Sequence, residues 1–88
     1  MNVAEAIEQK LLTLAPSRCE LADESSLHVG HAGAKDGGGH YRLTIVSAQF
    51  AGQNTLARHR MVYGALGGMM QKEIHALAIR AFAPDETT

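Results

Sequence analysis

The sequence has a single cysteine, no tryptophan and no long apolar run. Cys19 alone cannot form an intramolecular disulfide, and one thiolate cannot build a metal or iron–sulfur site of four thiolates. No apolar stretch approaches the roughly 20 residues of a membrane-spanning helix, and the first fifteen residues show no signal-peptide core. We therefore expect a soluble protein of a reducing compartment, cytoplasmic and without a membrane partner.

Common enzyme signatures are also absent. The sequence contains no Gly-X-Ser-X-Gly elbow, no Walker loop and no His-Glu-X-X-His motif. Eight basic residues oppose nine acidic ones, so the formal net charge of -1 gives no overall attraction to nucleic acid. With 88 residues, 45% of them hydrophobic, the chain suits one small globular domain over residues 1–88, and we expect no enzymatic activity.

The apolar pattern of the first half predicts one helix and two strands. Apolar residues recur at helical spacing from Val3 to Leu14, after a potential N-cap at Asn2 and before Pro16. Residues 18–23 and 40–47 then alternate between apolar and polar, as in strands with one buried face. We expect these strands to pair antiparallel, with Cys19 packed inward as a small core residue.

The second half adds a helix, a short helical turn and a last strand. Asn54 is a plausible N-cap for a helix that the pair Gly67-Gly68 interrupts. A separate short turn is then expected over 69–74, a strand over 76–82 and a frayed tail over 84–88. The predicted fold is α+β, in the order α-β-β-α-(short helix)-β, with helices on one face of a three-stranded sheet.

A long glycine-rich connection joins the first two predicted strands. Five of the ten residues from 30 to 39 are glycine, which disfavours regular structure. Residues 28–39 are therefore expected to form a flexible, exposed loop, and loops of this length in compact domains are usually functional or disordered. The loop carries His28 and His31, and His40 opens the next strand.

The five histidines are the best candidates for chemistry, because neutral imidazole binds zinc, copper and iron. His59 lies near the centre of an apolar helical stripe, so we expect a buried, structural side chain there. The stripe is formed by Val62, Tyr63, Leu66, Met69 and Met70. His40 is expected to be a surface or edge residue. His75 stands at a helix-to-strand junction, where its side chain could project into a cleft or simply be exposed. His28 and His31 in the loop could be ligands or could equally be solvated. The residues thus suggest at most part of a metal site, completed by a partner, since a closed site needs four ligands.

Six short segments of the sequence match the motifs of a known family, in the same order along the chain. They are Asp-Glu-Ser at 23–25, His-Val-Gly-His-Ala-Gly at 28–33, His-Tyr-Arg-Leu-Thr-Ile-Val-Ser at 40–47, Phe-Ala-Gly at 50–52, Arg-His-Arg-Met-Val-Tyr at 58–63 and Ile-His-Ala-Leu-Ala-Ile-Arg-Ala at 74–81. Together they resemble the BolA family over nearly the whole chain.

This resemblance implies a fold, a partner and a cofactor. The fold would be akin to the class II KH domain. The partner would be a monothiol (CGFS-type) glutaredoxin, with which a bridging 2Fe-2S cluster is shared in iron–sulfur trafficking or iron homeostasis. Glutaredoxin and glutathione would supply thiolates, and this chain would supply His75 and a loop histidine, His28 or alternatively His31. The chain alone would bind no cofactor.

The resemblance also implies an alternative function. Some BolA-like proteins are described as transcriptional regulators that bind DNA through a helix-turn-helix-like surface. In this sequence that surface would use Arg58, Arg60, Lys72 and Arg80. Whether the chain without a cluster forms a homodimer stays open.

Overall fold

The computed structural model describes residues 2–24 and 39–87 of the chain. Its regular elements are α1 (Val3–Leu11), β1 (Arg18–Asp23), β2 (Gly39–Val46), α2 (Thr55–Leu66) and β3 (Ile74–Phe82), with short 3-10 turns at Leu12–Leu14, Ala48–Phe50, Gly67–Gln71 and Pro84–Glu86. Within these residues, no helix is long and apolar enough to cross a membrane. Most of the predicted loop 28–39, including His28 and His31, lies outside the described residues, and Gly39 already belongs to β2.

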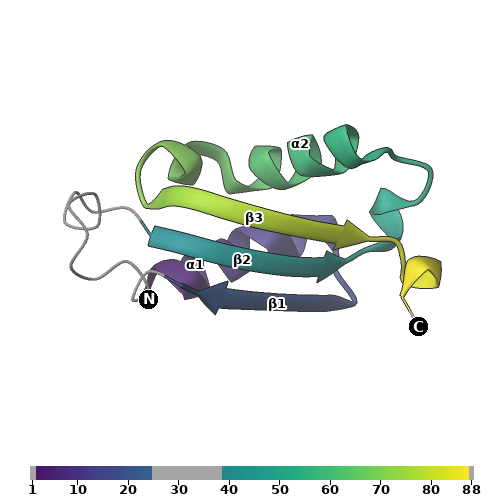
Figure 1. The fold of residues 1–88 in the computed structure, drawn as a ribbon, viewed down its shortest axis with the longest axis horizontal. Coiled ribbons are helices and arrows are strands. Elements are labelled where there is room, and N and C mark those ends of the chain that lie inside the picture. The colour runs from purple at the N-terminus through teal and green to yellow at the C-terminus, as the bar shows by residue number, and fades with distance from the viewer. Residues whose placement is uncertain (1, 25–38, 88) are drawn as a thin grey trace.

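The three strands form one mixed sheet in the order β1-β2-β3 (Figure 1). β1 and β2 pair antiparallel, with Cys19 opposite Ile45 and Leu21 opposite Leu43, which confirms the predicted pairing. β3 lies parallel to β2, so the chain must cross over between them, and α2 makes that crossover. The last strand begins at Ile74, two residues before the predicted 76–82.

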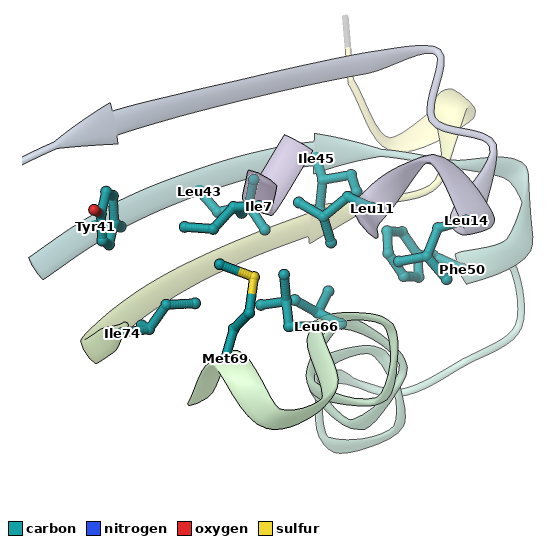
Figure 2. Packing of buried hydrophobic residues seen from close by; sticks show 11 residues of the cluster. Ile7, Leu11, Leu14, Tyr41, Leu43, Ile45, Phe50, Leu66, Met69 and Ile74 are labelled. Carbon is teal, nitrogen blue, oxygen red and sulfur yellow. The ribbon is translucent and has the colours of Figure 1, made fainter. Parts of the chain in front are cut away.

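Both helices bury their apolar sides against the same face of the sheet. Figure 2 shows this core, in which Ile7 and Leu11 from α1 meet Leu43 and Ile45 from β2 and Leu66 from α2; all five are fully buried. Burying one such side chain contributes about 1.5–3 kcal/mol. The α+β fold with helices on one sheet face is therefore as the sequence predicts.

Each helix begins at the predicted cap. The Oδ1 of Asn2 accepts a hydrogen bond from the backbone N–H of Glu5 at 2.8 Å, and the Oδ1 of Asn54 accepts one from Ala57 at 2.8 Å. These bonds satisfy amide groups that have no partner inside the helix. The two asparagines thus fix the starts of α1 and α2.

The end of α2 corrects two details of the prediction. The helix does stop before Gly67, whose φ of 58° and ψ of -132° suit a residue without a Cβ. The helical turn that follows spans Gly67–Gln71 instead of 69–74, and it is a 3-10 turn. Of the predicted apolar stripe, Val62 and Leu66 are buried, but Tyr63 is 41% exposed, because the side of α2 that meets the sheet is narrower than the stripe.

The C-terminal segment also differs from the expectation of a frayed tail over 84–88. Pro84–Glu86 forms a 3-10 turn, and the carboxylate of Glu86 binds the side chain of Arg58 on α2. The sequence pattern shows no regular element there, because the segment is held by a side chain 28 residues away. Thr88 lies outside the described residues.

Candidate functional site

β3 starts with an irregularity that sets His75 apart. Gly39 pairs with Ile74, whereas the next residue, His40, pairs with Ala76, so His75 is an extra residue on β3. Such a bulge redirects the side chain it carries, and bulges are frequent next to active sites. His75 is exposed, and its imidazole is therefore accessible from solvent.

His40 lies beside His75. The centroids of the two imidazole rings are 5.0 Å apart, and the ring planes are inclined by 36°. The sequence predicts only a surface or edge residue at His40, but the side chain is half-buried on the central strand. Sequence reasoning missed this proximity because it depends on the parallel register of β2 and β3, which no local pattern encodes.

Backbone hydrogen bonds hold the start of β2 on both sides. The N–H of Gly39 donates to the carbonyl of Glu73 at 2.8 Å, and the N–H of Glu24 donates to the carbonyl of His40 at 2.7 Å. A Cβ at Gly39 would collide with the ring of Tyr41, so any larger residue at this position would require the tyrosine ring to move. The main chain thus fixes the backbone positions from which His40 and His75 extend.

This pair is an incomplete ligand set. Among residues 2–24 and 39–87, no group of three or more His, Cys, Asp or Glu side chains could hold a metal ion. Two imidazoles leave two positions of a tetrahedral ion open to other ligands. The assignment of His28, or of His31 in its place, as a ligand remains a prediction, because both lie outside the described residues.

Cys19 is a poor additional ligand. Its side chain is half-buried and packs against the core. Burial, and secondarily the carboxylate of Glu8, raise the pKa of the thiol above its ordinary value. The protonated thiol is neither a good nucleophile nor a good metal ligand, which agrees with the predicted role as a small core residue.

At the other end of β3, Arg58 forms what we call the Arg58 clasp, its bonds to Gln53, Ala81 and Glu86. Its Nε donates to the carbonyl of Gln53 at 2.8 Å, and Nη1 donates to the carbonyl of Ala81 at 3.0 Å. Nη1 and Nη2 also reach the two carboxylate oxygens of Glu86 at 2.5 and 2.7 Å. A guanidinium has only five N–H donors, so Arg58 is almost fully engaged in joining α2, β3 and the C-terminal turn.

The clasp changes the acid–base behaviour of Glu86. The hydrogen bonds from Arg58, followed by one from the backbone N–H of Ala83 at 2.9 Å, lower the pKa of Glu86 to about 2. The hydrogen bond with Glu86 is also the largest cause that raises the pKa of Arg58. The pair is ionised throughout the physiological range, and its side chains are 12% and 40% exposed.

His59 is half-buried and not buried as predicted. It borders a pocket of about 320 Å³ between α2 and β3, together with Arg80, and its ring meets that of Tyr63 edge-on at 6.5 Å. A helical wheel assumes that the sheet covers a helix evenly along its length, whereas this pocket leaves one side of His59 uncovered. The ring of His59 therefore lies at the edge of this pocket and not within the core.

The four residues of the predicted DNA-binding surface differ in availability. Arg60, Lys72 and Arg80 are exposed, and the guanidinium of Arg80 lies over the ring of Phe82, 5.6 Å from its centroid. Arg58, in contrast, is occupied by the clasp. Three of the four residues are therefore free to contact an anionic partner.

The fold and this site define a class of small α+β domains that present a pair of histidines at a strand start. The model of the BolA-like protein family matches residues 11–86, and the chain belongs to this family. The recognition from sequence is confirmed.

Similar proteins and solved structures support membership of the same family. The DNA-binding transcriptional regulator BolA of Escherichia coli (strain K12) is 36% identical over 87 residues, covering 98% of this chain and 80% of that protein. SufE-like protein 1 of Arabidopsis thaliana is 36% identical over 91 residues, and the chain spans 24% of its length. The structure of BolA1 from Arabidopsis thaliana superposes with a TM-score of 0.85 at 36% identity, covering 100% of this chain and 98% of that one.

Proposed function

We propose that this protein is a non-enzymatic, cytoplasmic accessory protein of iron–sulfur and iron homeostasis. It binds a monothiol glutaredoxin and contributes His75 to a 2Fe-2S cluster shared with the glutaredoxin and glutathione. The second ligand from this chain is His28, with His31 as the alternative. The observation that carries the proposal is the exposed imidazole of His75 on a bulge at the start of β3.

The donor set fits such a cluster. Imidazole ligates one iron of some 2Fe-2S centres, where it raises the reduction potential relative to a site of thiolates alone. Within the described part of the chain, no three potential ligands lie together, and the one cysteine of the sequence is half-buried. The thiolates of the proposed cluster would therefore come from the glutaredoxin and glutathione. A histidine donor without a complete site is what a protein needs if it shares a cluster with a partner.

The test is a titration of cluster-loaded glutaredoxin with this protein, followed by visible circular dichroism. Wild type should produce a new spectrum that saturates at a fixed ratio of the two proteins. His75→Ala should abolish the change, and His59→Ala, which removes a histidine remote from the site, should leave it intact. A wild-type spectrum from His75→Ala would refute the ligand assignment.

The loop ligand is decided by two further variants. His28→Ala should alter the spectrum and His31→Ala should not, if His28 is the ligand. The reverse result would assign His31. Unchanged spectra from both variants would remove the loop from the proposal.

A plain interaction module makes a different prediction. In that case the glutaredoxin would bind this protein with the same affinity whether or not iron and glutathione are present. Calorimetric titration with cluster-free and cluster-loaded glutaredoxin separates the two cases. Equal affinities would favour the module and count against cluster sharing.

A second candidate function, DNA binding, is favoured by one observation, the name of the Escherichia coli relative. Here the phosphate contacts would come from Arg60, Lys72 and Arg80, since Arg58 is engaged elsewhere. Three such contacts predict that affinity falls roughly 40-fold between 50 and 200 mM salt. Fluorescence anisotropy with duplex DNA would measure this, and no binding at about 50 mM salt would exclude the function.

A further inference from the structure

His40 stands next to His75, although the proposed cluster role requires only His75 and a loop residue. The two rings lie on neighbouring parallel strands with centroids 5.0 Å apart. We propose that His40 and His75 together bind one divalent transition-metal ion, such as Zn²⁺ or Cu²⁺, on the free chain without any partner. The inference shares His75 with the proposed function but does not depend on a glutaredoxin or a cluster.

The ring separation suits coordination to a single ion. A zinc-bound imidazole nitrogen lies about 2.0–2.1 Å from the metal, which puts the ring centroid about 3.2 Å from it. Two such rings at a tetrahedral angle have centroids about 5.2 Å apart. The observed separation is 5.0 Å, so the two rings are spaced as two imidazole ligands of one ion are.

The backbone keeps the two histidines in this arrangement. His40 is on the central strand, and the bonds from Gly39 to Glu73 and from Glu24 to the carbonyl of His40 fix the start of that strand. The bulge places His75 alongside. Ligands carried by paired strands lose little further freedom when they bind an ion, which favours binding by only two protein ligands.

The ligand chemistry also defines which ions should bind. Imidazole suits zinc, copper and nickel, and affinity for a given nitrogen site is highest for Cu²⁺ among divalent first-row metals. Mg²⁺ prefers oxygen ligands and retains its water. With water in the remaining positions, the site should bind Cu²⁺ more tightly than Zn²⁺ and should not bind Mg²⁺.

The experiment uses the full chain without a histidine tag, since tag histidines bind the same ions. Calorimetric titration with Zn²⁺, and electron paramagnetic resonance of the Cu²⁺ form, should show one ion per chain with nitrogen ligands. His40→Gln and His75→Gln should each weaken Zn²⁺ binding at least about tenfold, the lower end of what even outer-shell losses cost at metal sites. His59→Gln is the matched control and should bind as wild type does.

Three results would overturn the inference: no Zn²⁺ binding by wild type, equal weakening by His59→Gln, or unchanged binding by His40→Gln. The double variant His28→Gln/His31→Gln should keep its affinity, and loss of binding there would assign the ion to the loop. Because His75 is exposed, His75→Gln should fold even if His40→Gln does not. Metal-induced stabilisation in thermal unfolding, present in wild type and absent in His75→Gln, then provides the readout.

The outcome is separate from that of the proposed function. Zn²⁺ binding by the free chain together with no spectral change on glutaredoxin titration would support the metal site alone. The opposite pair of results would support cluster sharing and refute the two-histidine site. If both hold, Zn²⁺ added before the glutaredoxin should suppress the cluster spectrum, because His75 cannot serve both.

Discussion

The two ends of β3 use their polar side chains in opposite ways. At its start, His75 is exposed beside His40. Near its end, the side chain of Arg58 on α2 forms hydrogen bonds with Ala81 and Glu86 and is only 12% exposed. One end presents an imidazole to solvent, while the other fastens α2 and the C-terminal turn to the sheet.

The difference shows how prominence in the sequence can mislead. Arg-His-Arg at 58–60 is the more conspicuous segment, yet its first arginine is structural and His59 is half-buried at a pocket rim. His75 stands in a plain apolar strand, where a bulge turns it outward. Whether a side chain can act on another molecule depends on how many of its donors the fold already uses.

The largest expected effect on stability is that of Arg58→Ala. The change removes four hydrogen bonds from one side chain and should lower the Tm by on the order of 5–10 °C. Thermal unfolding by circular dichroism measures it. The folded variant should still give the cluster spectrum, and a loss of that spectrum would mean that the two ends are coupled.

Arg58→Lys should lie between wild type and Arg58→Ala. Lysine keeps the charge, but its ammonium cannot bind both oxygens of Glu86 in a fork and also reach Gln53. We expect about half of the fall in Tm seen with alanine, measured in the same way. A wild-type Tm would show that charge alone holds the clasp.

Glu86→Gln should have a smaller effect that depends on pH. The pKa of Glu86 is about 2 in the folded protein, against an ordinary value of 4.5. The depressed pKa means that its stabilisation is fully present above pH 4.5 and is lost as the pH falls towards 2. Urea unfolding of both proteins should show a stability difference that shrinks over this window, and a constant difference would refute the ionic contribution.

His75→Ala should have the smallest effect on stability. The side chain is exposed, so the free energy of unfolding should change by no more than about 0.5 kcal/mol. Urea unfolding without added metal tests this against the loss of the cluster spectrum in the same variant. A large destabilisation would mean that His75, like Arg58, has a structural role, and the contrast between the two ends would fail.

Local patterns in the sequence predicted many elements of the fold correctly. Alternation predicted β1 at 18–23 as it is observed, and Asn2 and Asn54 cap their helices as expected. Gly67 ends α2 because it adopts a positive φ. The errors lie where a long-range contact replaces a local preference: the tail is ordered by Arg58, and Tyr63 faces solvent because the sheet covers only one side of α2.

The sequence by itself determined the order of elements, the family and the choice of His75 as a candidate ligand, because periodicity, caps and short motifs are properties of neighbouring residues. Only the tertiary structure decided that His40 lies beside His75 and that the side chain of Arg58 binds Ala81 and Glu86. The first depends on the register of β2 and β3, and the second on a salt bridge between residues 28 positions apart in the chain. Such pairings form only when the sheet and the core assemble.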